Sequence, residues 1–241
     1  MALRWAAALE KAAGLPELAQ VYEERERVLR DTIRTLYWDA GRELFADTPS
    51  KQQFSQHTNT MAVLADVATR EEARALMLRT LTATGLAQGA LYFKFYMHQA
   101  LAKVGEGDRY LEQLDDWRGM LANGLTTFAE VVDRPGRPSR SDCHAWSASP
   151  NIELMRTVLG VDSAAPGFSR VVVRPHLGQL KFVEGTVPHP KGLIEVRVEA
   201  TGNVGVNSPV DGEFLWRGTR HELRAGANRF TVPALRSEPR P

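Results

Sequence analysis

Residues 193–200, LIEVRVEA, alternate between apolar and charged side chains along most of their length. A period of two places the apolar and the charged side chains on opposite faces of a β-strand. The apolar members of the alternation are Ile194, Val196 and Val198. This stretch therefore predicts a strand with one face in a core and the other in solvent.

Other short runs of the same kind surround this strand. They lie at 169–175, 180–187, 212–218, 221–225 and 228–232. Turn-forming sequences separate the runs, namely HPKG at 189–192, PVDG at 209–212 and Ala225-Gly226. Short strands at this spacing predict a small antiparallel β-sandwich over 166–241.

The chain before residue 166 has a helical period instead. In 17–37, apolar side chains recur three and four residues apart, which places them on one face of a helix. Further helices are predicted at 57–69, 71–83, 89–104 and 108–121, and a sixth from Ser149-Pro150 to Gly160. Short links favour antiparallel hairpins, and three hairpins make half of a six-hairpin toroid. The predicted fold is thus α then β, with a helical domain over 1–165, a boundary near 161–168 and the sandwich after it.

Composition excludes some classes of function. Thirty basic and 29 acidic residues give a formal net charge of +1, which supplies no field to attract nucleic acid or an anionic membrane. The first residues, MALRWAAALEKAAG, predict a helix rather than a secretory signal, because Glu10 and Lys11 interrupt the apolar run. No stretch reaches the ~20 apolar residues that span a bilayer. The single cysteine, Cys143, permits no intrachain disulfide, and we expect a cytoplasmic protein.

Residues 122–148 interrupt the helical pattern. They show no sustained period and contain two prolines and two glycines. A loop of this length in a compact domain is usually functional or disordered, and its aromatic residues argue against simple disorder. The histidines of the chain show no i, i+4 pair with a carboxylate partner, so neither a metal site nor a cofactor is expected.

Three segments carry a resemblance through their order and spacing. They are FSQHTNTMAVLADVA at 54–68, FKFYMHQALAKVGEGDRYLEQLDDWRGMLANGLTTFAE at 93–130, and SRSDCHAWSASPNIELMRTVLGV at 139–161, which continues into PGFSRVVVRPHLGQLKFVEGTVPHPKGLIEV. From about Tyr37 to Val196 the chain resembles the α-L-rhamnosidases of glycoside hydrolase family 78. The resemblance implies the C-terminal part of such an enzyme, comprising the end of a six-hairpin helical toroid and a C-terminal β-sandwich.

Members of this family hydrolyse terminal α-L-rhamnosides with inversion, which requires a carboxylic acid and a carboxylate base ~6.5–9.5 Å apart. The family's base follows a Gly-x-Thr-Thr stretch, which here is GLTTFAE at 124–130. The resemblance therefore implies Glu130 as the general base. Many relatives have tryptophan where this chain has Ala129, which leaves the sugar less defined than the chemistry. Nothing matches the family's acid, since Glu23-Glu24-Arg25-Glu26 lies within a regular amphipathic helix.

His144 and Trp146 form a second candidate cluster shortly after this motif. The resemblance implies that His144 lies near the sugar, where an imidazole N–H donates to a hydroxyl. The Trp146 ring either stacks on the apolar face of a sugar or packs beneath the loop.

His57 and Asn59 are the remaining candidate substrate-binding residues, at the start of the helix predicted over 57–69. Polar side chains at a helix N-terminus can line the mouth of a toroid. The alternative is helix capping, in which Ser55 or Thr58 accepts hydrogen bonds from free backbone N–H groups.

Three functions follow from these observations. The first is the C-terminal part of an inverting α-L-rhamnosidase-like hydrolase that binds carbohydrate. The second is a non-catalytic remnant or a sugar-binding or interaction module, because the acid is missing. The third is another six-hairpin-toroid glycosidase with a different sugar. Half a toroid leaves helices uncovered, so we also expect exposed apolar surface and either self-association or an upstream half-domain as partner.

Overall fold

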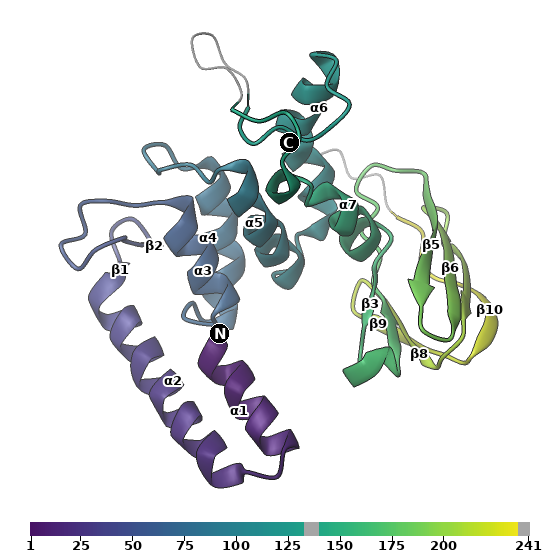
Figure 1. The fold of residues 1–241 in the computed structure, drawn as a ribbon, viewed down its shortest axis with the longest axis horizontal. Helices are drawn as coiled ribbons and strands as arrows, with labels where there is room; N and C mark the ends of the chain where they lie inside the picture. Colours follow the sequence, from purple (N-terminus) through teal and green to yellow (C-terminus); the bar gives the residue numbers. More distant parts are fainter. Residues whose placement is uncertain (133–139, 236–241) are drawn as a thin grey trace. The chain divides into compact units, whose positions relative to one another are not determined.

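The computed structural model of the chain describes residues 1–132 and 140–235 (Figure 1). The chain divides into two compact units, Met1–Glu106 and Gly107–Pro241. Most helices come first and the two four-stranded β-sheets last, which confirms the fold class predicted from the sequence. The units divide the chain at a different place from the predicted boundary near 161–168, and the domains 1–165 and 166–241 stay a prediction.

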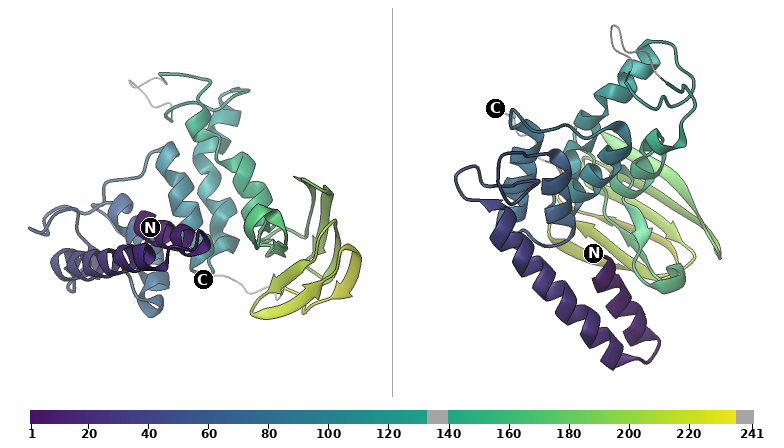
Figure 2. Two further views of the ribbon diagram at one scale, coloured as in Figure 1. Left: turned by 60° about the horizontal axis from the view of Figure 1, so that its bottom comes forward. Right: turned by 60° about the vertical axis from the view of Figure 1, so that its left-hand side comes forward.

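The first unit begins with a helical hairpin whose two helices lie side by side, drawn in purple in Figure 2. Its helices are α1 (Ala2–Ala12) and α2 (Pro16–Tyr37). Gly14 turns the chain between them with φ at +80°, a conformation that costs glycine little. Pro16 occupies the first turn of α2, where a backbone N–H has no partner within the helix in any case.

Three further helices and a small β-hairpin complete the first unit. They are β1 (Trp38–Asp39), β2 (Leu44–Phe45), α3 (Gln56–Leu64), α4 (Arg70–Thr82) and α5 (Leu91–Lys103). Thr69 and Glu72 form a reciprocal capping box at the start of α4, which satisfies two backbone N–H groups. Buried apolar side chains from these elements form one core, including Phe45, Val63, Leu76, Met77 and Leu101.

The apolar stripe of the α1–α2 hairpin faces solvent. Its exposed large side chains are Trp5, Leu9, Leu15, Leu18, Val21, Val28, Leu29, Ile33 and Leu36. The side of the hairpin that faces the rest of the unit is polar instead: Arg34 makes a two-pronged ion pair with Glu72 of α4, at 2.6 and 2.8 Å. This inverted arrangement leaves a long apolar face without a cover among the described residues.

The second unit begins with short helical segments. They are η1 (Gly107–Leu114), α6 (Asp115–Ala122), η2 (Ala145–Ser147), α7 (Pro150–Glu153) and η3 (Leu154–Val158). The sequence predicted one helix over 108–121, but residues up to Leu114 wind as a 3-10 helix before α6 begins. Three residues per turn align Leu111 with Leu114, and both pack against the core of this unit.

Two four-stranded sheets follow and enclose a common core. Their strands are β3 (Val161–Ser163), β4 (Val171–Val173), β5 (Phe182–His189), β6 (Gly192–Glu199), β7 (Asn203–Ser208), β8 (Gly212–Trp216), β9 (Thr219–Leu223) and β10 (Gly226–Thr231), with a 3-10 turn, η4 (Pro166–Phe168), between β3 and β4. The strand orders are β10-β7-β6-β5 and β3-β4-β8-β9. Neighbouring strands run antiparallel except β4 and β8, which are parallel because the chain visits the other sheet between them.

The alternation of LIEVRVEA appears as predicted in β6. Ile194, Val196 and Val198 are buried in the core between the sheets, where Phe214 and Trp216 meet them from β8. Glu195 and Arg197 point outward to solvent, as the period of two requires. No helix within the described ranges is long and apolar enough to cross a membrane.

Candidate functional site

Glu130 lies on a loop that folds back on itself within the second unit. The backbone N–H of Glu130 donates to the carbonyl of Ser141 at 2.8 Å, and that of His144 donates to the carbonyl of Phe128 at 2.7 Å. The Thr127 hydroxyl also bonds to the backbone carbonyl of Asp142. These ladder-like contacts bring the motif GLTTFAE alongside the segment that carries His144.

The Glu130 carboxylate is held by a guanidinium. Arg140 donates from Nη2 to Oε1 at 2.6 Å and from Nε to Oε2 at 3.2 Å, a two-pronged arrangement that orients a carboxylate plane. The Glu130 side chain is 21% exposed and that of Arg140 is 76% exposed, so the pair opens to solvent on the arginine side. Sequence reasoning missed Arg140, although a basic residue in the same loop as a candidate carboxylate is a signal for it.

His144 and Trp146 lie together at the next turn of the same loop. Their ring centroids are 5.6 Å apart with the planes nearly perpendicular, an edge-to-face contact. The carbonyl of His144 accepts from the Ser147 hydroxyl at 2.8 Å, and the Trp117 indole N–H of α6 donates to the Ser147 carbonyl at 2.7 Å. These bonds anchor the turn below the rings.

Trp146 is 65% exposed, whereas the alternative predicted for it was packing beneath the loop. An exposed indole edge-on to an imidazole presents an apolar face of the kind on which sugars stack. The structure thus brings three of the predicted site residues onto one loop, namely Glu130, His144 and Trp146.

The other two predicted residues belong to the first unit. His57 packs its ring against Phe93 of α5 with centroids 4.1 Å apart. Asn59 is fully buried, and its amide ties α3 to β2 by accepting from the Phe45 N–H at 2.8 Å and donating to the Phe45 and Ser55 carbonyls. The role of both in sugar binding stays a prediction, and the amide of Asn59 already has backbone partners.

Helix capping, the alternative for this segment, is present. The Ser55 hydroxyl accepts from the backbone N–H of Thr58 at 3.2 Å at the start of α3. Within residues 1–132 and 140–235, no three side chains of His, Cys, Asp or Glu gather in a way that would hold a metal ion.

Comparisons with known proteins indicate which proteins this chain is similar to. Residues 160–211 match the family model described as the bacterial alpha-L-rhamnosidase C-terminal domain. A family 78 rhamnosidase from Bacillus sp. GL1 is 30% identical with a TM-score of 0.75, over 82% of this chain and 22% of that chain. A search of curated proteins found no match.

Two further solved structures are similar. A rhamnosidase from Klebsiella oxytoca with rhamnose bound is 26% identical with a TM-score of 0.57, over 63% of this chain and 31% of that chain. An alpha-L-rhamnosidase from Streptomyces avermitilis complexed with L-rhamnose is 17% identical with a TM-score of 0.78, over 95% of this chain and 26% of that chain, and this likeness concerns the fold alone. The chain thus spans about a fifth to a third of the length of these solved relatives.

Proposed function

Because this chain belongs to the α-L-rhamnosidase family of glycoside hydrolases, family 78, we propose that it forms the C-terminal part of an inverting enzyme that hydrolyses terminal α-L-rhamnosides. The observation that carries the proposal is Glu130, which ends the motif GLTTFAE and has its carboxylate oriented by the fold of its loop. The helices of the first unit contribute to a helical toroid in this proposal.

Glu130 is the general base of the proposed reaction. Its carboxylate takes a proton from a water molecule as that water attacks the anomeric carbon on the face opposite the leaving group. The pair with Arg140 stands mostly in solvent on the arginine side, so substrate and water reach the carboxylate when the guanidinium moves aside. The acid that protonates the leaving oxygen comes from another part of the longer enzyme in this proposal.

His144 and Trp146 bind the sugar beside this base. The exposed Trp146 ring supplies a surface for the apolar face of the sugar. The His144 ring, edge-on to it, supplies a polar group for a hydroxyl. An aromatic face with a nearby imidazole suits a deoxy sugar, which has both a methyl group and hydroxyls.

The test of this function is a panel of aryl glycosides offered to the longer enzyme that contains this chain. We expect turnover of the α-L-rhamnoside well above that of the β-D-glucoside or the glucuronide, and proton NMR should detect β-L-rhamnose as the first product. Preference for a glucoside or uronide would overturn the sugar assignment, and a first product of α configuration would overturn the inverting mechanism.

The apolar face of the α1–α2 hairpin should drive association. We expect the chain alone to sediment faster as its concentration rises, because burying this face removes apolar surface from water. Replacing Leu18 and Leu29 together with glutamate should shift the species toward the 26.8 kDa monomer. Gln20→Glu, a change of exposed charge on the same helix, serves as the control.

Sedimentation velocity measures this association. The mass of the native polypeptide distinguishes the two candidates that could cover the apolar face, an upstream half-domain and a second copy of the chain. A native mass well above 26.8 kDa would assign the cover to an upstream half-domain, and a matching mass would assign it to a second copy. A monodisperse monomer that binds no hydrophobic dye would contradict the prediction.

A further inference from the structure

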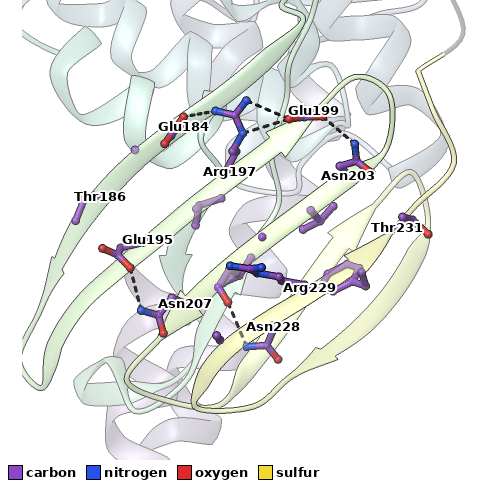
Figure 3. A pocket seen from close by; sticks show the side chains of 17 residues that line it. Glu184, Thr186, Glu195, Arg197, Glu199, Asn203, Asn207, Asn228, Arg229 and Thr231 are labelled. Atoms are coloured by element: carbon purple, nitrogen blue, oxygen red, sulfur yellow. Dashed lines mark hydrogen bonds and ion pairs between the residues drawn. The ribbon is translucent and has the colours of Figure 1, made fainter.

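The outer face of the sheet β10-β7-β6-β5 carries an ordered grid of polar side chains (Figure 3). Strand register places the outward residues in three rows across the sheet. The rows are Thr186, Glu195, Asn207 and Ala227; Glu184, Arg197, Gly205 and Arg229; and Phe182, Glu199, Asn203 and Thr231. A depression of about 910 Å³ lies over this face, a volume that suits a small-molecule or oligosaccharide ligand.

Gly205 stands at the centre of the grid. An added side-chain carbon at Gly205 would meet no atom within 4 Å, so the sheet has an open gap there. Arg197 lies across the ladder on one side of the gap and Arg229 on the other. Gly205 therefore forms the floor of the depression, because it has no side chain and lies between two long arginine side chains.

Two carboxylate–amide pairs border this gap. Asn207 donates to the Glu195 carboxylate at 2.9 Å, and Asn203 donates to the Glu199 carboxylate, also at 2.9 Å. Each pair holds its two planar groups in place. The Glu195 carboxylate keeps lone pairs for a ligand, as do the two amide oxygens, whereas the Glu199 carboxylate also accepts from Arg197 and Thr201. Such fixed acceptors and donors reduce the ordering cost that a ligand must meet on binding.

The two arginines differ in their bonding. Arg197 bonds to Glu184 and, at 3.0 Å, to Glu199, so it is fixed within the grid. The Arg229 side chain is exposed and makes no hydrogen bond or ion pair with the described part of the chain, although its backbone pairs with Gly205 in the sheet. Its guanidinium donors are therefore available to a ligand above the gap.

The charges of this face select the chemistry of its occupant. Three glutamates and two arginines nearly cancel, so neither an anion nor a cation is favoured over a neutral molecule. A protein interface is disfavoured, because charged residues are depleted from interface cores and desolvating them is costly. Paired carboxylates, amides and a free guanidinium match instead the neighbouring hydroxyls of a sugar chain.

We propose that the depression around Gly205 on the outer face of the sheet β10-β7-β6-β5 binds a neutral oligosaccharide. This site is built wholly within the sandwich and shares no residue with the loop that carries Glu130. It rests on the proposed function for the choice of a rhamnose-containing probe and for its physical role. Its physical role is to hold a glycan chain on the protein while another part of that chain is hydrolysed.

The test is a calorimetric and NMR titration of the whole chain with neutral oligosaccharides, namely α-L-rhamnosyl-(1→2)-D-glucose, cellohexaose and maltohexaose, with oligogalacturonate as the anionic comparator. Gly205→Thr fills the gap with a residue that strands favour, and no steric clash arises at its first side-chain atom. We expect this variant to weaken binding of a neutral oligosaccharide at least tenfold, and Arg229→Ala to weaken it severalfold. Arg224→Ala, at an exposed arginine outside the grid, is the matched control.

Several outcomes separate this site from the proposed catalytic site. Glu130→Gln should leave oligosaccharide binding unchanged, and circular dichroism with Tm values should show that Gly205→Thr keeps the fold. Absence of saturable binding to every neutral probe would overturn the proposal. So would binding lost in Glu130→Gln but kept in Gly205→Thr, or tighter binding of the anionic oligomer than of any neutral one.

Discussion

Replacing Glu130 with glutamine in the longer enzyme is expected to lower kcat for an aryl α-L-rhamnoside by about 10²–10⁴-fold, the usual contribution of a general base. Glutamine keeps the size of the side chain and its ability to hydrogen-bond, but it takes no proton from water. KM should change little, because a base acts mainly in the transition state. Steady-state kinetics with the aryl substrate measure the effect.

The control for this variant is Glu112→Gln, at a partly exposed glutamate of η1 that pairs with Arg109. It should keep full activity, since a surface ion pair of this kind contributes little. A second variant, Glu130→Ala, adds a readout that structural damage alone would not give. Added azide should restore turnover and yield the β-L-rhamnosyl azide, because the anion attacks without a base where water needs one. Full activity of Glu130→Gln would sink the assignment.

The first unit is expected to lose stability on mild acidification because of His98. This histidine lies on α5 and is almost completely buried. Burial, with a smaller contribution from the positive charge of Lys94, lowers the pKa of His98 to about 3. The unfolded chain keeps the ordinary histidine pKa of about 6.5.

Acidification lowers the free energy of unfolding because the unfolded chain takes up a proton at His98 more readily than the folded chain does. Between pH 6.5 and 3 the unfolded state binds a proton at His98 that the folded state does not, so the free energy of unfolding falls as the pH falls. The stabilisation is complete above pH 6.5 and is lost progressively down to about pH 3. By pH 5 the loss from this group is about 2 kcal/mol, at about 1.4 kcal/mol for each pH unit.

Denaturant unfolding at pH 7 and pH 5 measures this loss, and His98→Gln should make the first unit's stability less dependent on pH. Burial also lowers the pKa of His176 in the second unit, so His176→Gln is the matched variant that removes the second contribution. Paired carboxylates take up their protons at lower pH than these histidines, because Arg34 lowers the pKa of Glu72 to about 2. An unchanged pH dependence in His98→Gln would contradict the prediction.

The motif assignments came from resemblance, and the structure added how their residues meet. GLTTFAE pointed to Glu130, and SRSDCHAW pointed to His144 and Trp146. The backbone bonds from Glu130 to Ser141 and from His144 to Phe128 were not readable from the sequence. Arg140 was missed because its place in the same loop only suggests a partner for Glu130, whereas the course of the loop fixes the pairing.

Asn59 shows the limit of reading a polar residue at a helix start. Its amide hydrogen-bonds to the backbone of Phe45 in β2, because the chain before α3 folds back against the helix. A sequence gives the donor and acceptor capacity of asparagine, but burial decides whether that capacity is used inside the protein or offered to a ligand.

The sequence by itself determined which residues share a face. The period of two in LIEVRVEA defined β6 and its buried valines, and the helical period in 17–37 defined α2 and its apolar stripe. Only the tertiary structure decided what each face meets: the valines meet the second sheet, whereas the stripe of α2 meets solvent. The reason is physical, because periodicity is a property of the local backbone, whereas the cover of a face is chosen by packing between segments far apart in the chain.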